Sequence, residues 1–325
     1  MSVAEAAPDV LVLRQKVHGM GVDEYAAALR DRLPARNVVV ARTPSEERSL
    51  LRQTPIATGF DIDAELLEDS PLRYFACVFA GTGHLPMDAL AAHNVAVTNA
   101  AGVHGPNIGE QVLGYLLTFA RRLHVGWRRG RRREWRSYQT HELNGSTVTV
   151  VGMGALGEAI VERLAPFGVH TVGIRHSPGK GGPTDEVFGY GDDIHEPVSR
   201  SDYLVLAAPL TETTRGLVDA ELFRTMPPEA VLVNVGRGGL VETDALVDAL
   251  RSHAIRGAAL DVTDPEPLPE DHPLWTLENA LITPHNAGHT PEYWERMADI
   301  VATNVDRVLD DGASQGLRNQ VRPPE

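Results

Sequence analysis

Three polar residues in the second half of the chain have the types and the placement to act on a carbonyl compound. Arg237, Glu266 and His285 each follow a short apolar run of the kind that forms a buried parallel strand. Ligands of open α/β sheets bind beyond the carboxyl ends of the strands, so these side chains are expected at one edge of one sheet. A cation can polarise a carbonyl oxygen and grip a carboxylate, and a histidine beside an anion can donate a proton. Together the three residues suit hydride transfer to a carbonyl acid.

A glycine turn identifies the sheet that positions these residues. Thr147–Val151 has the branched apolar residues of a buried strand, and Gly152-x-Gly154-x-x-Gly157 follows it directly. Gly152 permits the tight turn, Gly154 lets the backbone approach a pyrophosphate, and Gly157 lets the next helix pack closely on the strand. A helix that begins near Ala155 would point its N-terminal N–H groups at the phosphates. The pattern therefore predicts a dinucleotide-binding turn.

Strand and helix patterns alternate along the chain, which indicates an α/β protein. The 325 residues exceed one ordinary core, and 42% hydrophobic residues suffice for two domains. The first series has strand candidates at Val10–Val12, Val38–Val40, Ile56–Thr58, Tyr74–Phe79 and Val95–Thr98, and helical candidates at Tyr25–Arg32, Ala64–Leu67 and Met87–His93. The second series has six strand candidates, at Thr147–Val151, His170–Ile174, Tyr203–Ala207, Val231–Val235, Gly257–Asp261 and Ala280–Ile282.

Two long helical patterns connect the series. Ile108–His124 carries apolar residues at helical spacing and precedes the second series, and Pro291–Leu309 has an apolar face that can return to the first. We therefore predict two Rossmann-like domains with doubly wound parallel sheets, the second inserted in the first. Residues 1–104 and 290–325 would form the first domain, and residues 105–289 the dinucleotide-binding Rossmann domain.

The residues after the second strand of the predicted Rossmann domain bear on the choice of cofactor. An NAD site places an acidic residue about 20 positions beyond the glycines to bind the ribose 2′-hydroxyl. This chain has Arg175, His176 and Ser177 there. A guanidinium can pair with a 2′-phosphate and a serine can add a hydrogen bond, so NADP is favoured over NAD.

The composition excludes several other classes of protein. No apolar run approaches the length of a membrane span, and the first residues lack the order of a signal peptide, so a cytoplasmic protein is expected. Cys77 is the only cysteine and lies in an apolar run, which leaves no thiol-based metal site, and no histidine pair has zinc-site spacing. The net charge of −14 disfavours nucleic-acid binding.

Four segments taken together resemble the D-isomer-specific 2-hydroxyacid dehydrogenase family. They are VGMGALG, VNVGRGGLV, ALDVTDPEPLP and LITPHNAGHT, in this order. FAGTGHLPMDAL in the first half of the chain is similar to the substrate domain of the family, although Gly83 and Pro86 replace aspartates that many relatives carry. The resemblance implies that Arg237 binds the substrate carboxylate and carbonyl oxygen. It also implies that His285 is the acid/base and that Glu266 favours its protonated form.

The resemblance extends to the binding residues. It implies that the first domain cradles the substrate carboxylate with the backbone of Ala80, Gly81, Thr82 and Gly83. Asp261 would lie near the nicotinamide and accept from its carboxamide. The other implied cofactor contacts are Ala155, Leu156, Pro209, Thr214 and Val235.

Substrate, assembly and an alternative function remain open at this point. Glyoxylate or hydroxypyruvate reduction is one specific activity within the expected reaction, which converts a 2-keto acid to a D-2-hydroxy acid reversibly. A homodimer is expected, because members of the family pair through the Ile108–His124 region and Tyr115 and Phe119 offer apolar surface there. Some proteins of this fold are non-catalytic nucleotide-sensing corepressors, and Arg121–Arg136 contains eight arginines with two tryptophans. A solvated helix end or a subunit contact is the favoured interpretation of that stretch.

Overall fold

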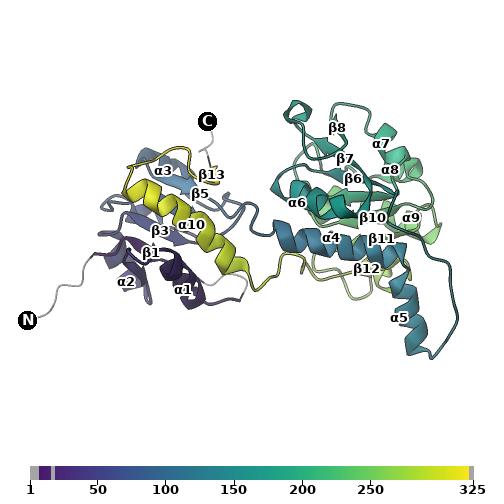
Figure 1. The fold of residues 1–325 in the computed structure, drawn as a ribbon, viewed down its shortest axis with the longest axis horizontal. Coiled ribbons are helices and arrows are strands. Elements are labelled where there is room, and N and C mark those ends of the chain that lie inside the picture. The colour runs from purple at the N-terminus through teal and green to yellow at the C-terminus, as the bar shows by residue number, and fades with distance from the viewer. Residues whose placement is uncertain (1–6, 16–18, 322–325) are drawn as a thin grey trace, which may run out of the picture. The chain divides into compact units, whose positions relative to one another are not determined.

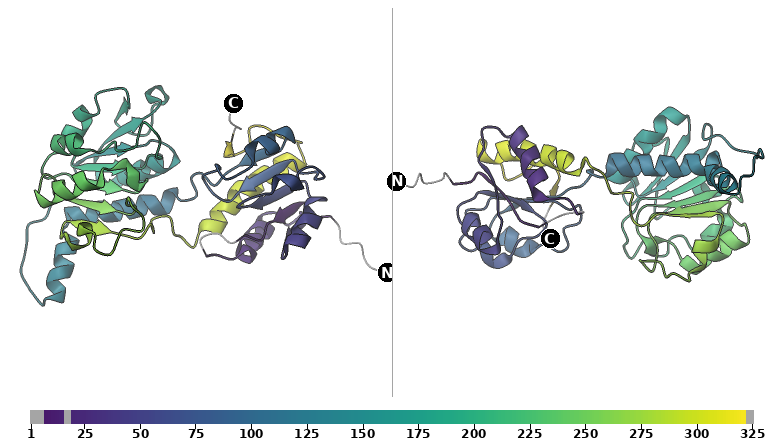
Figure 2. Two further views of the ribbon diagram at one scale, coloured as in Figure 1. Left: turned by 180° about the vertical axis from the view of Figure 1, so that it is seen from behind. Right: turned by 90° about the horizontal axis from the view of Figure 1, so that it is seen from below.

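The computed structural model describes residues 7–15 and 19–321, which form two compact α/β units. One unit combines the described residues up to Val103 with those from His289 onward, and the other spans His104–Gly288. The second unit is therefore inserted in the first, as Figures 1 and 2 show by the teal and green segments between purple and yellow ones. Each unit is built on one mainly parallel sheet.

The first unit has a sheet in the order β13-β5-β4-β3-β1-β2, in which only β13 pairs antiparallel. Its elements are β1 (Val10–Val12), α1 (Val22–Arg32), β2 (Val38–Val40), α2 (Pro44–Leu51), β3 (Ile56–Gly59), η1 (Ala64–Leu66), β4 (Tyr74–Cys77), α3 (Met87–Ala92), β5 (Ala96–Thr98), α10 (Tyr293–Leu309) and β13 (Gln320–Val321). The long helix α10 packs beside α1, and the ring of Trp294 stacks on that of Tyr25 with 4.5 Å between centroids (Figure 2). The C-terminal helix thus returns to the first unit, as its apolar face predicts.

The second unit has a seven-stranded parallel sheet in the order β12-β11-β10-β9-β6-β7-β8. Its elements are α4 (Gly105–Ala120), α5 (Leu123–Arg131), β6 (Thr147–Val151), α6 (Ala155–Leu164), η2 (Ala165–Phe167), β7 (His170–Arg175), η3 (Pro178–Lys180), β8 (Glu186–Gly189), α7 (His195–Ser199), β9 (Tyr203–Leu206), α8 (Ala220–Thr225), β10 (Val231–Asn234), η4 (Gly238–Leu240), α9 (Thr243–Arg251), β11 (Gly257–Leu260), η5 (Pro273–Thr276) and β12 (Ala280–Ile282). The strand order reverses between β6 and β9, so the carboxyl edge at β6 is the topological switch point where such sheets bind ligands.

The apolar periodicity of the sequence does not predict the elements that are short or polar. Seven strands replace the expected six, because β8 has the sequence EVFG, with only two large apolar residues, and lies at the edge of the sheet. Helix α2 is stabilised by its cap rather than by an apolar stripe, since the side chain of Thr43 accepts from the backbone N–H of Glu46 and Pro44 follows it. The two-residue strand β13 carries no periodic signal.

The prediction of a single helix over Ile108–His124 is wrong. Helix α4 ends at Ala120, Arg122 adopts a left-handed backbone with φ of 50°, and α5 begins at Leu123 in a new direction (Figure 1). Arginine gives no sequence signal for such a break, which glycine or proline would supply. Tyr115 and Phe119 are also not surface residues, because both are buried against the sheet of the same unit.

The apolar surface of this region lies instead on α5 and the segment after it. The large exposed side chains are Leu123, Trp127 and Trp135. Figure 1 shows α5 extending away from the sheet, with an extended segment returning toward β6. The described residues include no helix with the length and apolar character to cross a bilayer.

Candidate active site

His285 and Glu266 form a close pair at the carboxyl edge of the second sheet. His285 follows β12, and its Nδ1 lies 2.6 Å from Glu266 Oε1. Both side chains are about half exposed, His285 at 51% and Glu266 at 42%. The bond to Glu266 leaves Nε2 of the imidazole as the ring nitrogen for another partner. The geometry that the sequence predicts for these two residues is thus present.

The backbone of His285 is held in an uncommon conformation. Its φ is 52°, in the left-handed region that non-glycine residues rarely adopt. Its N–H donates to the carbonyl oxygens of Asp261 and Thr283, at 2.8 and 3.0 Å. Such conformations persist where the surroundings fix them, and they are frequent in active sites. The turn therefore sets the direction of the imidazole.

Asp261 anchors the loop that carries His285. Its carboxylate is 3% exposed and accepts from Thr283 Oγ1 at 2.5 Å, from the N–H of Asn286 at 2.9 Å and from the N–H of Ala287 at 3.0 Å. Tyr115 extends the network, since its hydroxyl lies 2.5 Å from Thr283 Oγ1. Three donors already occupy this carboxylate, so its role in the fold is to fix the loop; a contact with the nicotinamide carboxamide remains a prediction.

Arg237 lies in the loop after β10 and is exposed. Its Nη1 donates to the carbonyl of Gly236 at 2.7 Å. Asn234, which is buried at the end of β10, fixes this loop because its side chain donates to the carbonyl of Arg237 and accepts from the N–H of Gly236. A Cβ on Gly238 would lie 1.9 Å from the carbonyl oxygen of Thr263. The glycine beside Arg237 therefore serves backbone packing.

Asn234, which fixes the loop of Arg237, is a residue that the sequence analysis does not predict. The sequence feature that could have indicated it is a polar residue near the end of the apolar run Val231–Val235.

Arg237 and His285 follow β10 and β12, the two neighbours of β11 in the sheet, so both lie at the same carboxyl edge. The edge carries a guanidinium and a histidine–carboxylate pair, the groups needed to hold a carboxylate and move a proton.

The glycine turn fits a bound pyrophosphate. Gly152 has φ of 98°, and a Cβ there would lie 2.5 Å from the backbone N of Ala208. A Cβ on Gly157 would lie 2.1 Å from the carbonyl oxygen of Gly152, so these two glycines allow close packing of strand and helix. Gly154, at the start of α6, has nothing within 4 Å of the position of a Cβ. That open backbone beside the helix N-terminus is the feature that a phosphate requires.

A pocket of about 250 Å³ lies above this turn. Its lining contains seven of the predicted cofactor residues: Gly152, Gly154, Arg175, His176, Ser177, Pro209 and Thr214. Thr214 is buried and acts on the loop itself, because its hydroxyl donates to the carbonyl of Pro209 at 2.6 Å. Five lining residues were not predicted: Met153, Lys180, Tyr190, Thr211 and Thr213. Lys180 could have been noticed, since it is one of two lysines in the chain.

Five predicted cofactor residues lie outside this lining, and one of them is Gly157, which packs against the carbonyl of Gly152 as described above. Ala155 is exposed in the first turn of α6, and Leu156 is partly buried against the core of the unit. Val235 is buried just beyond β10, and Asp261 is buried as described above. The structure therefore brings most of the phosphate-turn residues and the residues at the end of β7 together in one pocket, and it places these five around the same sheet edge.

Arg175, the last residue of β7, is partly engaged within the protein. Its Nη1 donates to the carbonyl of Gly181 and lies 3.7 Å from Glu158 Oε1, and its side chain is 14% exposed. Within the described residues no other atom bonds this guanidinium, so its Nε and Nη2 have no protein partner. The guanidinium thus uses one edge to hold the loop after β7, and its other edge has no partner among the described residues.

The predicted substrate cradle lies in the first unit, in the loop that follows β4. Ala80, Gly81 and Gly83 are exposed, and a Cβ on either glycine would meet nothing within 4 Å. The carbonyl of Ala80 accepts from Asn99 Nδ2 at 2.7 Å, and that of Thr82 accepts from the N–H of Leu85 at 3.0 Å. The loop therefore presents open backbone that is fixed at both ends, as a carboxylate cradle requires.

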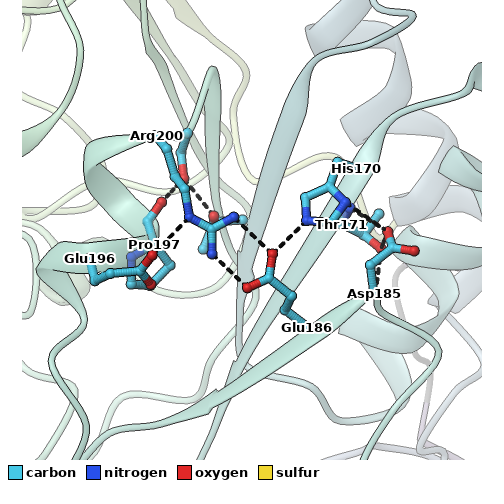
Figure 3. A network of polar contacts seen from close by, with 9 residues as sticks. His170, Thr171, Asp185, Glu186, Glu196, Pro197 and Arg200 are labelled. Atoms are coloured by element: carbon cyan, nitrogen blue, oxygen red, sulfur yellow. Dashed lines mark hydrogen bonds and ion pairs between the residues drawn. The ribbon is translucent and has the colours of Figure 1, made fainter.

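The most extensive charge network lies at the opposite, amino-terminal ends of β7 and β8 (Figure 3). Glu186 accepts two hydrogen bonds from Arg200, at 2.8 and 2.7 Å, and lies 2.6 Å from His170 Nε2. Arg200, followed by His170, lowers the pKa of Glu186 to about 2. Hydrogen bonds from the backbone and hydroxyl of Thr171 lower the pKa of Asp185. These contacts fasten the edge strand β8, and none of them lies in the cofactor pocket.

The inserted parallel sheet, its glycine turn and the ionisable residues at its carboxyl edge define an oxidoreductase that uses a nicotinamide dinucleotide. The family model described as D-isomer specific 2-hydroxyacid dehydrogenase, NAD binding domain, matches residues 113–287, more than half of the chain. The chain belongs to this family of NAD(P)-dependent 2-hydroxyacid oxidoreductases.

Named relatives align with most of the chain. It is 32% identical over 273 residues to human glyoxylate reductase/hydroxypyruvate reductase, covering 81% of this chain and 80% of the relative. It is 31% identical over 275 residues to D-3-phosphoglycerate dehydrogenase of Methanocaldococcus jannaschii, covering 83% of this chain and 52% of the relative. The solved D-isomer specific 2-hydroxyacid dehydrogenase from Xanthobacter autotrophicus Py2, in complex with NADPH and MES, is 28% identical with a TM-score of 0.77, covering 98% of this chain and 99% of that chain.

Proposed function

We propose that the chain reduces a 2-keto acid to a D-2-hydroxy acid, reversibly, with NADPH as the favoured reductant. The observation that carries this proposal is the 2.6 Å pair of His285 and Glu266 at the sheet edge that also holds Arg237. A proton donor and a carboxylate-binding cation are the two groups that carbonyl reduction needs from the protein.

The contacts of the residues support the role proposed for each. Arg237 holds the substrate carboxylate and polarises the carbonyl oxygen, because its guanidinium is exposed beyond β10. His285 donates a proton to that oxygen from Nε2, since Nδ1 faces Glu266. Glu266 stabilises the imidazolium as an anion and fixes the ring. When bound, the nicotinamide supplies the hydride that the carbonyl carbon receives.

The two units divide the binding work in this proposal. The inserted unit holds the dinucleotide through Gly152, Gly154 and the N-terminus of α6, whose open backbone suits a pyrophosphate. The first unit holds the substrate carboxylate with the exposed backbone of Ala80–Gly83. Asp261 keeps the His285 loop in place, and any contact it makes with the carboxamide adds to that task.

Preference for NADPH over NADH is supported by the pocket at the end of β7. The pocket is lined by Arg175, His176, Ser177 and Lys180. NAD sites have an acidic residue at the end of this strand, whereas this chain has Arg175, His176 and Ser177 there. The Xanthobacter relative was solved with NADPH. Glu158 lies 3.7 Å from Arg175 and places one carboxylate near this end of the pocket, so NADH is the less favoured alternative rather than an excluded one.

The experiment that tests the reaction is NADPH oxidation with a panel of 2-keto acids. Glyoxylate and hydroxypyruvate lead the panel, because the human relative carries both names, and longer aliphatic and aromatic acids follow. We expect turnover with at least one acid and a higher kcat/KM with NADPH than with NADH. Cofactor binding without turnover on any acid would instead favour the alternative, a nucleotide-sensing binding protein.

We also propose that the chain forms a homodimer through the outer face of α5. Leu123 and Trp127 lie on one side of this helix and are 54% and 75% exposed, and neighbouring exposed apolar side chains are a feature of protein interfaces. Sedimentation velocity tests this: the wild type should run as a dimer, and Leu123→Glu with Trp127→Glu should run as a monomer. A monomeric wild type would refute the dimer.

A further inference from the structure

Helix α4 carries three polar side chains beside the apolar stripe that packs on the sheet of the inserted unit (Figure 1). Asn107, Gln111 and Tyr115 follow one another at intervals of four residues, so they form one ridge along the helix, which we call the polar ridge. The loop that carries His285, residues 283–287, lies against this ridge. Each end of the loop is hydrogen-bonded to a side chain of the ridge.

The first contact of the ridge runs through two hydroxyl groups to a carboxylate. Thr283 Oγ1 donates its single proton to Asp261 Oδ1, so in the 2.5 Å contact between the two hydroxyls the donor is Tyr115. Burial raises the pKa of Tyr115, so its hydroxyl keeps the proton that it donates. Gln111 is a further hydrogen-bond partner of this hydroxyl. A directed series of hydrogen bonds therefore leads from α4 to the anchoring carboxylate of Asp261.

The second contact of the ridge holds the other end of the same loop. Asn107 Nδ2 donates to the carbonyl of Ala287 at 2.6 Å, and the N–H of Ala287 donates to Asp261 Oδ2 at 3.0 Å. Both backbone groups of this buried alanine are therefore bonded. Helix α4 thus holds the loop at Thr283 and at Ala287, which lie two positions before and two positions after His285.

Helix α4 is itself fixed, because it packs closely on α6. A Cβ on Gly109 would lie 3.1 Å from the carbonyl oxygen of Ala159, so the lack of a side chain there allows the close approach of the two helices. Arg163 of α6 donates from Nε to the carbonyl of Pro106 at 3.1 Å. Since α6 begins at the glycine turn of the cofactor pocket, α4 connects that side of the unit with the loop of His285.

We propose that Tyr115 and Asn107 are positioning residues for His285, and this inference rests on the proposed role of His285 as the proton donor. They act at Thr283 and Ala287, on either side of the histidine. The side chain of His285 is 51% exposed, so the bonds that hold its backbone, rather than packing around the ring, set the direction of the imidazole. A proton donor must lie within hydrogen-bond reach of the carbonyl oxygen, so displacement of this loop lowers kcat.

The kinetics of Tyr115→Phe test the proposal, since this variant removes the hydroxyl and keeps the ring. We expect kcat for keto-acid reduction to fall about threefold to tenfold, the effect of one neutral hydrogen bond, while the affinity for NADPH stays unchanged. Tyr25→Phe is the matched control. In the first unit the Tyr25 hydroxyl bonds Thr58 Oγ1 at 2.8 Å, and Thr58 donates to the carbonyl of Ala76, so this variant breaks the same kind of series and should leave kcat unchanged.

Combined variants show whether the ridge acts through His285. Thr283→Ser keeps the hydroxyl that Tyr115 bonds, whereas Thr283→Val removes it. Tyr115→Phe should therefore lower kcat in the Thr283→Ser background and have no further effect in the Thr283→Val or the His285→Ala background. Asn107→Ala removes the donor to the carbonyl of Ala287 and should likewise lower kcat only while His285 is present. An equal loss in the His285→Ala background would show a general structural role and overturn the proposal.

Hydrogen exchange separates a failure of this inference from a failure of the proposed reaction, because it needs no turnover. The amides of Asn286 and Ala287 should exchange faster in Tyr115→Phe than in the wild type, and Tyr25→Phe should leave their exchange unchanged. If the wild type reduces no keto acid, the proposed reaction is wrong, whereas faster exchange would still support the hold of α4 on the loop. Exchange at both amides and kcat equal to those of the wild type in Tyr115→Phe would overturn the inference.

Discussion

Asp261→Asn tests how the loop that carries His285 is held. Asparagine keeps the shape of the side chain but has one acceptor oxygen, whereas the buried carboxylate accepts from Thr283, Asn286 and Ala287. At least one of the two backbone N–H groups loses its acceptor, and the bonds that remain are neutral. A hydrogen bond to a charged group contributes about 1.5–3 kcal/mol and a neutral one about 1 kcal/mol, so we expect a loss of about 2–4 kcal/mol in the free energy of unfolding.

Urea unfolding followed by tryptophan fluorescence measures that loss, and hydrogen exchange locates it. The amides of Asn286 and Ala287 should exchange much faster in the variant, and keto-acid reduction should fall because His285 is no longer held. Asp264→Asn is the control, since Asp264 is exposed three positions along the chain. Unchanged stability together with unchanged exchange at Asn286 and Ala287 would refute the anchoring role of Asp261.

Three further predictions concern other parts of the molecule. Arg237→Lys keeps the charge but loses the planar fork, so kcat/KM for keto acids should fall at least tenfold; near-normal kinetics would remove Arg237 from the site. Arg175→Asp should weaken NADPH binding by about 1–3 kcal/mol in a fluorescence titration and shift the preference toward NADH, and an unchanged NADPH to NADH ratio would disprove its role. Glu186→Gln should destabilise the protein only above the pH at which Glu186 ionises in its bonded state. Arg200 and His170 depress the pKa of Glu186 from 4.5 to about 2. The urea midpoint of the wild type should therefore exceed that of the variant by its full amount above pH 4.5, and the difference should vanish as the pH falls to about 2. A difference that stays constant between these pH values would contradict the assignment.

The sequence predicts the parts of this fold whose signals are local. Buried parallel strands such as β6 consist mainly of branched residues, and Gly157 is required by a contact within a few residues, because a Cβ there would clash with the carbonyl of Gly152. The helix α10 has a continuous apolar face, so its return to the first unit follows from its pattern. The contact of Glu266 with His285 was expected from the family resemblance rather than from spacing alone.

The features that the sequence does not predict depend on tertiary contacts. Arg175 donates to the carbonyl of Gly181 and lies near the carboxylate of Glu158, and the spacing of residues in the sequence does not predict such contacts. The break between α4 and α5 rests on a left-handed Arg122, which has no propensity for that conformation. Tyr115 has the same apolar spacing whether it faces the core or a partner, so only the structure shows that it is buried.

The most direct test of the central claim is the pH–rate profile of keto-acid reduction by the wild type, His285→Ala and Glu266→Gln. General acid–base catalysis contributes about 10²–10⁴-fold, so His285→Ala should lose that much at every pH while it still binds NADPH. Glu266→Gln removes the anion 2.6 Å from Nδ1 of His285, so this variant should reduce keto acids more slowly than the wild type while it still binds NADPH. His93→Ala, at the exposed end of α3, should match the wild type. Near-full activity of His285→Ala, or a Glu266→Gln profile that coincides with that of the wild type, would contradict the assignment of the proton donor and its partner.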